Sequence, residues 1–322
     1  MPWGDFVLTD ISIIVISNRG IDEKLSLAPI TKTKFYNPGY DEITNLKEVI
    51  MSYYLQFLKW PGVSEYLSKK DLILFPIGAI EQHGQHLPLM TDSAWAVDVA
   101  EAVAAREKVL VCPPLYFGWS PHHMAYPGTI TLRPETMIQV ILDVCNSLLF
   151  HGFKKILILN GHRVANLPPI EIAASKIRNA TNAYVAILDL AMIVVEEVRI
   201  ICESDVGGFG HADEIETSFM LYKHPELVDM AKAGKNVSPV KSRFSHSFIS
   251  PDQALTGNRF WSKPTIEEWH KTTEPYGMKG DAFLGTAEKG KRIFEAIVEN
   301  VSKVIDEISN IEVEIVNKKV PI

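Results

Sequence analysis

The chain has 322 residues, of which 47% are hydrophobic, which is enough for one large α/β domain or two smaller ones. Its formal charge of −7, with no basic run interleaved with aromatic residues, argues against nucleic acid as a partner. The N-terminal apolar run "ISIIVI" is too short to span a membrane, and the few cysteines have no metal-ligand spacing, so we expect a soluble cytoplasmic protein with reduced thiols.

Residues 1–59 are expected to form an N-terminal extension packed on the core. The apolar spacing predicts a strand at 11–16 and a helix at 46–58, and nothing in this section carries obvious chemistry. Trp60-Pro61-Gly62 is expected to interrupt the chain before a short helix at 63–67. Residues 60–322 would then form the main domain.

The stretch around which the chain is organised follows a short apolar run at 72–75, which reads as a buried strand. Directly after it come Glu81, His83, His86 and Asp92, four potential metal ligands. Isolated residues of these types are usually solvated, but four together at the end of an apolar strand favour a metal site. Imidazole mixed with carboxylates suits Zn, Mn or Fe(II).

The next elements alternate between helix and strand. A helix is predicted at 93–107 with Asp92 or Ser93 as its N-cap, then a strand at 109–112 and a long loop at 115–132. Pro134 suits the first turn of a helix that runs to residue 150 and is closed by Gly152. This alternation predicts a mostly parallel sheet with helices on both faces.

A second strand, at 155–159, ends in Asn160-Gly161-His162. If both strands deliver their loops to one crevice, His162 would lie opposite Glu81, His83 and Asp92. Gly161 permits a sharp turn of the backbone there. Another helix and a strand ending near residue 190 follow.

A third polar motif, "HADEIETS", lies at the start of a predicted helix that follows a glycine-rich stretch. It contains His211, Glu214 and Glu216. The helix dipole alone would account for two carboxylates in a first turn, so this motif by itself is ambiguous. The last predicted helix, at 286–308, has one apolar stripe.

Taken together, these motifs resemble those of the creatininase (creatinine amidohydrolase) family over roughly residues 60–295. The segment 81–92, "EQHGQHLPLMTD", matches the family's first motif with Gln85 in place of the usual Pro. The other matches, in the same order along the chain, are "SPHHMAYPGTITL", "NGH", "HADEIETS" and "GDAFLGTAEKGK". In the second of the five motifs, His122 stands where an acidic residue is common.

The resemblance implies a three-layer α/β/α sandwich with a mostly parallel central sheet, and two divalent metal ions (Zn, Mn or Fe) per chain. Carried over, Glu81 and His162 would bind one metal and His83 the other, with Asp92 bridging both. It also implies a homo-oligomer, commonly a hexamer, that acts on a small-molecule substrate.

Further roles follow from the same resemblance. His211 would be the proton donor to the leaving group, while Ser120 and the loop around His123 would line the substrate pocket. Two ions sharing a hydroxide would attack the carbonyl of the substrate.

The chain departs from the members that hydrolyse creatinine. Those members carry Tyr-Glu after "NGH", and the Glu binds the second metal, whereas Arg163 and Val164 stand here. Glu214 or Glu216 is the candidate replacement. The Trp that precedes the catalytic His in those members is also missing. We therefore expect a substrate other than creatinine, and Arg163 favours a carboxylate, a phosphate or a polyhydroxylated ring.

Three functions remain open on the sequence. The leading one is hydrolysis of the C–N bond of a cyclic or formyl amide. The second is hydrolytic ring opening of a cyclic ketone such as a keto-inositol, in which a C–C bond breaks. The third is a non-catalytic, metal-binding assembly protein, although the presence of His211 and Ser120 argues against it.

Overall fold

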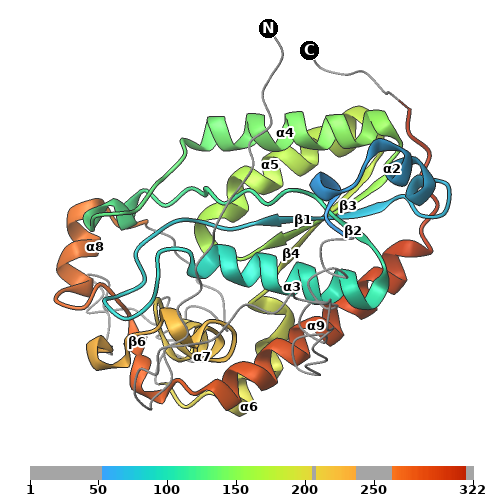
Figure 1. The fold of residues 1–322 in the computed structure, drawn as a ribbon. Helices are drawn as coiled ribbons and strands as arrows, with labels where there is room; N and C mark the ends of the chain where they lie inside the picture. Colours follow the sequence, from blue (N-terminus) through green and yellow to red (C-terminus); the bar gives the residue numbers. More distant parts are fainter. Residues whose placement is uncertain (1–52, 205–207, 237–262, 317–322) are drawn as a thin grey trace, which may run out of the picture. The chain divides into compact units, whose positions relative to one another are not determined.

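The computed structural model describes residues 53–204, 208–236 and 263–316, drawn in colour in Figure 1. The strand expected at 11–16 and most of the helix expected at 46–58 lie outside these ranges, so the proposed N-terminal extension stays a prediction. Within 53–59, the structure has a short 3-10 helix, Leu55–Phe57, and a bridge between Tyr54 and Val111.

A parallel sheet forms the centre of the described chain. Its strand order is β2-β1-β3-β4. The bounds are β1 Leu72–Ile77, β2 Leu110–Val111, β3 Lys155–Asn160 and β4 Tyr184–Asp189. Every residue of β1 and β3 is buried, which explains their continuous apolar sequences. A separate antiparallel pair joins β5, Lys235–Asn236, to β6, Gly280–Asp281.

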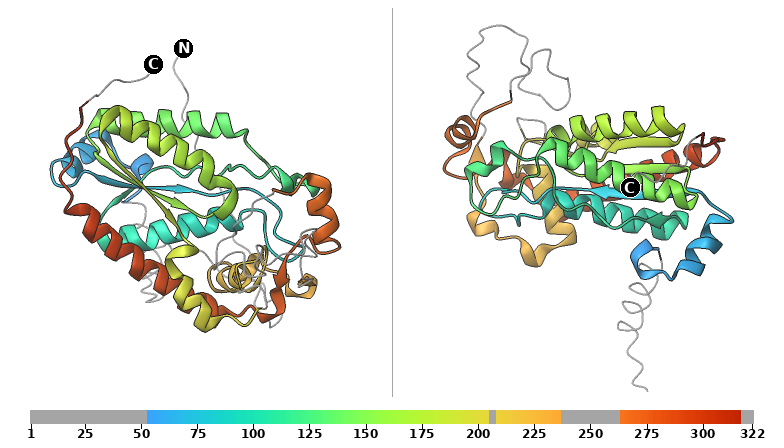
Figure 2. Two further views of the ribbon diagram at one scale, coloured as in Figure 1. Left: turned by 180° about the vertical axis from the view of Figure 1, so that it is seen from behind. Right: turned by 90° about the horizontal axis from the view of Figure 1, so that it is seen from above.

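Helices cover both faces of the sheet, as predicted (Figures 1 and 2). Because side chains alternate along a strand, Leu72 and Leu74 of β1 pack into one core cluster and Ile73 and Phe75 into the other. The first cluster includes α3, Thr91–Glu107, and α9, Ala287–Ser309. The second includes α4, Pro134–His151, and α5, Arg163–Thr181. The three-layer architecture is therefore confirmed.

Four further α-helices lie in the described residues. They are α2 Trp60–Leu67, α6 Val195–Ile201, α7 Glu214–Lys223 and α8 Ile266–Thr273. Helix α7 packs against α9, and α8 packs against the short 3-10 helix His122–Ala125. In the part of the chain that the structure describes, no helix has the length and apolar character needed to span a bilayer.

Two local predictions were wrong. Helix α2 begins at Trp60 rather than at residue 63, because Pro61 is compatible with the first turn of a helix. Neither Asp92 nor Ser93 is an N-cap: Met90 holds that position, and α3 begins at Thr91. Asp92 instead lies in the first turn, and the Ser93 hydroxyl donates to the Ala79 carbonyl at 2.8 Å.

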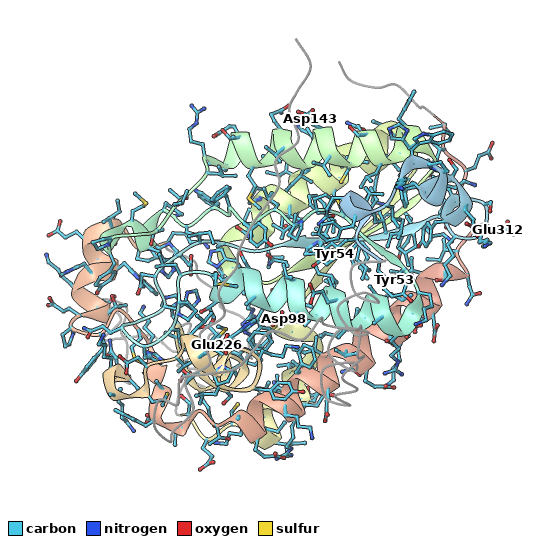
Figure 3. All side chains as sticks on the ribbon, in the orientation of Figure 1. Tyr53, Tyr54, Asp98, Asp143, Glu226 and Glu312 are labelled. Carbon is cyan, nitrogen blue, oxygen red and sulfur yellow. The ribbon has the colours of Figure 1, made fainter. Side chains whose placement is uncertain are left out.

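Polar contacts tie other segments to α3. The Tyr54 hydroxyl lies 2.9 Å from Oε1 of Glu101, to which it donates a hydrogen bond. Nε2 of His224, at the end of α7, lies 2.7 Å from Oδ2 of Asp98. Tyr54 and Asp98 are labelled in Figure 3.

Candidate metal centre

The carboxyl ends of β1 and β3 bring the first two motifs together. Ile77 pairs in register with Asn160, so the loops that follow the two strands leave the sheet at the same edge. Gly161 makes this possible, because a Cβ there would overlap the carbonyl oxygen of Asp92. The first turn of α3 and the end of β3 are therefore in direct contact.

One group of ligand-type side chains consists of Glu81, Asp92 and His162. Nε2 of His162 lies 3.3 Å from Oε2 of Glu81, and its Nδ1 lies 3.1 Å from Oδ2 of Asp92. All three side chains are buried. Their ligand atoms lie within 4.8 Å of one another, which is close enough for one ion to contact all three.

A second group surrounds His83. Nδ1 of His83 donates to the carbonyl oxygen of Glu81 at 3.1 Å, which leaves Nε2 facing the site. Nε2 lies 3.3 Å from Oδ1 of Asp92 and 3.7 Å from Oε2 of Glu216. Asp92 thus directs one oxygen toward His83 and the other toward His162, so its carboxylate belongs to both groups.

Several of these atoms are buried and form no hydrogen bond of good geometry with any other described residue. They are both carboxylate oxygens of Glu81, Nε2 of His83 and Oδ2 of Asp92. Buried polar atoms are normally hydrogen-bonded, so a set of orphaned oxygen and nitrogen atoms that converge on one space requires another explanation. Side chains of this kind fit divalent Zn, Mn or Fe.

The electrostatics also fit a cation site. Burial opposes charge on His83, yet the carboxylates of Asp92 and Glu216 raise the pKa of that imidazole to about 10. Burial likewise opposes charge on His162, but Glu81 and Asp92 raise its pKa to about 9. Burial itself raises the pKa of Glu81 to about 7. The carboxylates therefore favour positive charge on buried side chains.

His211 lies next to both groups, and one of its ring nitrogens is within 4.8 Å of ligand atoms of His83 and Glu216. Its Nε2 donates to the carbonyl oxygen of Gln82 at 2.6 Å, so its Nδ1 is the atom left to act, 3.7 Å from Oε1 of Glu81. The Gln82 side chain donates to Nδ1 of His123 at 3.2 Å, which turns Nε2 of His123 toward Glu81, at 3.4 Å. Burial lowers the pKa of His211 well below its ordinary value, so the imidazole is neutral.

The predicted substrate residues occupy different places. The Ser120 hydroxyl is buried, 3.4 Å from Nε2 of His162. Arg163 begins α5, where its Nε lies 3.7 Å from Oδ2 of Asp189 and its guanidinium packs over the Phe209 ring. Arg163 belongs to none of the ligand groups, and its guanidinium forms an ion pair with Asp189.

Glu214 and Glu216, which the sequence left as alternatives, point in different directions. Glu216 joins the His83 group. Glu214 accepts hydrogen bonds from the backbone amides of Glu203 and Ser204 at 2.8 and 2.7 Å, and from Nζ of Lys289. The structure thus places Glu214 in a structural network outside the ligand groups. His86 is outside them as well, with its Nε2 on the Thr217 hydroxyl.

Sequence reasoning missed three residues of the site. Gln82 stands inside the first motif, where its position between two predicted ligands was a usable signal. Trp269 comes from α8, and its ring centroid lies 4.7 Å from that of His123 and 5.6 Å from that of His211. Lys279 lies with its Nζ 4.4 Å from the Trp269 ring centroid. The last two come from distant segments without a recognisable motif.

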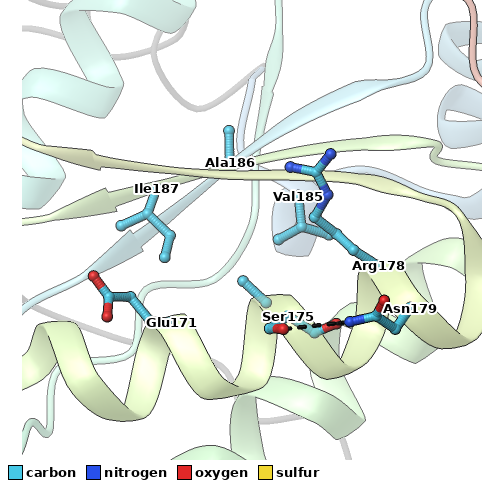
Figure 4. Close-up of a pocket in the computed structure, with 8 residues that line it drawn as sticks. Glu171, Ser175, Arg178, Asn179, Val185, Ala186 and Ile187 are labelled. Carbon is cyan, nitrogen blue, oxygen red and sulfur yellow. Dashed lines mark hydrogen bonds between the residues drawn. The ribbon is translucent and has the colours of Figure 1, made fainter.

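A surface groove of about 570 Å³ lies elsewhere, between α5 and β4 (Figure 4). Glu171, Ser175 and Arg178 are among the residues that line it. None of the ligand-type residues described above contributes to its wall, so we assign the groove no part in the centre.

Comparison with known proteins agrees with the geometry. The chain is 27% identical over 267 residues to a 3-dehydro-scyllo-inosose hydrolase of Thermotoga maritima, covering 79% of this chain and 83% of that protein. A creatinine amidohydrolase of Pseudomonas putida is 26% identical over 270 residues, with 78% and 95% covered. A solved structure of a putative creatinine amidohydrolase from Bacteroides fragilis superposes with a TM-score of 0.64 at 29% identity, covering 81% and 98%. The creatininase family model, described as creatinine amidohydrolase, matches residues 56–305. The chain therefore belongs to the creatininase family of hydrolases.

Proposed function

We propose that this protein is a binuclear-metal hydrolase that cleaves the C–N bond of a cyclic or formyl amide. The observation that carries the proposal is the position of Asp92, whose two carboxylate oxygens face His83 and His162 separately. A carboxylate in this position is suited to bridge two cations. The family membership supports hydrolysis, and the orphaned buried atoms support metal binding.

In this proposal Glu81 and His162 would hold one ion, His83 and Glu216 would hold the other, and Asp92 would serve both. Two divalent ions would supply an activated water and polarise the substrate carbonyl. Hydrogen bonds within the protein orient the side chains that would hold the two ions. For example, the hydrogen bond from His83 Nδ1 to the Glu81 carbonyl oxygen keeps Nε2 of His83 directed toward the site.

His211 is the residue that moves the proton. Because Gln82 holds Nε2–H of His211, its Nδ1 has an open lone pair directed at the site. A neutral imidazole can take a proton from the attacking water and deliver it to the leaving nitrogen. Gln82 therefore acts as a positioning residue, since it selects the tautomer that makes this transfer possible.

Two features of the site favour a substrate other than creatinine. Glu216 lies in the His83 group, where it would replace the Glu that follows "NGH" in the creatinine-hydrolysing members, and Trp269 of α8 packs on His123 from a different part of the chain. Ser120 and His123 lie next to this site, in contact with His162 and Glu81. We place the substrate against Trp269, with its carbonyl toward the two ligand groups.

The second candidate function is ring opening of a cyclic ketone by C–C hydrolysis. The similarity to the Thermotoga maritima 3-dehydro-scyllo-inosose hydrolase favours it. The same side chains would serve, because water again adds to a carbonyl, and His211 would protonate the carbon that leaves as an enolate. The hexamer and the cytoplasmic location expected from the sequence remain predictions.

The experiment that tests the proposal is a metal determination followed by a substrate panel. Protein reconstituted with Zn, Mn or Fe is incubated with N-formyl amides, lactams and a keto-inositol. Release of an amine from the amides supports C–N hydrolysis, whereas release of acid from the keto-inositol alone supports the second candidate. Absence of turnover on every compound with each metal would refute both and leave the non-catalytic assembly protein.

A further inference from the structure

Lys279 is a partly buried cation next to His211, the proposed proton-transfer residue. Its backbone pairs with that of His211 through two hydrogen bonds of 2.8 Å, so its position relative to the site is fixed. The side chain is partly buried, and Nζ lies 4.4 Å from the centroid of the Trp269 ring. Within residues 53–204, 208–236 and 263–316, no Asp or Glu forms an ion pair with this ammonium group.

Trp269 connects Lys279 to the site. Trp269 is only 7% exposed, and its ring packs on His122, His123 and His211, with ring centroids 4.8, 4.7 and 5.6 Å away. Its Nε1–H is buried and has no hydrogen-bond acceptor in the described chain. A buried indole N–H normally donates to an acceptor. Among the described residues, neither Trp269 Nε1–H nor the Lys279 ammonium has the acceptor that a buried donor normally has.

The charges are distributed unequally over the site. Glu81, Asp92 and Glu216 all face the ligand groups. On the side of Trp269, burial together with repulsion from His162, Lys263 and Lys279 lowers the pKa of His122 to about 3. His122 is therefore neutral, and the charged group in contact with the Trp269 ring is the Lys279 ammonium.

We propose that Lys279 and Trp269 form an anion subsite that binds a carboxylate of the substrate while the carbonyl of the substrate faces the metal ligands. The inference rests on the proposed hydrolase function and narrows it to anionic substrates. The ammonium group supplies a charge-assisted hydrogen bond, and Trp269 Nε1–H supplies a neutral one. The ligand carboxylate would in turn provide the counter-charge that the described residues do not offer to Lys279.

Equilibrium binding tests the subsite without requiring turnover. The probes are N-formylglycine and its neutral analogue N-formylglycinamide, titrated by calorimetry into Mn-loaded full-length protein. Wild type should bind the anion about tenfold more tightly or better. In Lys279→Met the ratio of the two dissociation constants should approach one, and Lys279→Arg should keep most of the preference.

Lys271→Met is the matched control, because Lys271 lies on the same helix as Trp269 but pairs with Glu267 in solvent. It should retain the wild-type ratio. A wild-type protein without preference, or a Lys279→Met protein that keeps it, would overturn the subsite; the second result would mean that the carboxylate binds elsewhere, such as on the metal. If Lys279→Met does not fold, Lys279→Gln provides the same comparison. Failure to release formate would count against amide hydrolysis only, so the two proposals fail separately.

Discussion

At the scale of single residues, Asp92 shares its carboxylate between His83 and His162. Replacing Asp92 with Asn keeps the shape of the side chain but removes the charge that both ions need. We expect the metal content after reconstitution to fall from about two ions per chain to near zero. Elemental analysis of dialysed protein measures this. A variant that keeps both ions would show that Asp92 does not bridge them.

His211 is expected to behave differently from the ligands. In His211→Gln the proton carrier is lost while Glu81, His83, Asp92 and Glu216 remain, so turnover should fall by about 10²- to 10⁴-fold with metal content unchanged. The readouts are steady-state kinetics on the active substrate class and elemental analysis of the same sample. Loss of a metal ion from this variant would instead identify His211 as a ligand, a position that its distance from His83 and Glu216 allows.

At the scale of an element, the direction of each side chain on α7 decides its role. Glu214 and Glu216 are two residues apart, which places them about 200° apart around a helix. Glu216→Gln should lower the metal content from about two ions to about one. Glu214→Gln should keep both ions but destabilise the fold by about 1–3 kcal/mol, because buried backbone amides and Lys289 lose a charged acceptor.

The two Gln variants are matched controls for each other, measured by elemental analysis and thermal unfolding. The reverse pattern, with metal lost only from Glu214→Gln, would contradict the assignment of Glu216 to the His83 group. The sequence could not decide between the two residues, because the rotation of α7 about its axis is set by its packing on α9 and not by its local pattern.

The contact between α7 and α3 predicts a pH dependence of stability. The hydrogen bond to Asp98 raises the pKa of His224 above its ordinary value. A raised pKa in the folded state means that the stabilisation is complete below about pH 6.5 and is lost as the pH rises through the folded-state pKa. The His224→Gln substitution should therefore cost more stability at pH 5.5 than at pH 9, by about 1 kcal/mol or less for this partly exposed pair.

Chemical denaturation at the two pH values measures this difference. Asp98→Asn removes the partner and should abolish the pH dependence of the His224→Gln effect. An equal loss at both pH values would show that His224 contributes by packing rather than by its charge.

The order of the main elements was predictable because their signals are local. The continuous apolar runs of β1 and β3 and the Pro134 and Gly152 boundaries of α4 were all apparent in the sequence. The N-terminus of α3 was not. Asp92 has the residue type of an N-cap, but in the structure it lies in the first turn and faces two histidines. A preference for capping could not reveal that tertiary contact.

At the scale of the whole molecule, residues far apart in the chain converge at one edge of the sheet. Glu81, Asp92 and His162 were predicted to meet because they follow strands whose carboxyl ends are adjacent. Trp269 and Lys279 follow no strand of this sheet and reach the site through the packing of α8 and the backbone pairing with His211. The candidate metal ligands could thus be predicted from the sequence, whereas Trp269 and Lys279, which would select the substrate, could not.

The most direct test of the central claim is anomalous diffraction from crystals of the protein grown with Mn²⁺. Two peaks are expected about 3.5–4 Å apart, each in contact with one oxygen of Asp92, one next to His162 and the other next to His83. A single peak, or a pair of peaks with the imidazole of His162 turned away from Glu81 and Asp92, would contradict it.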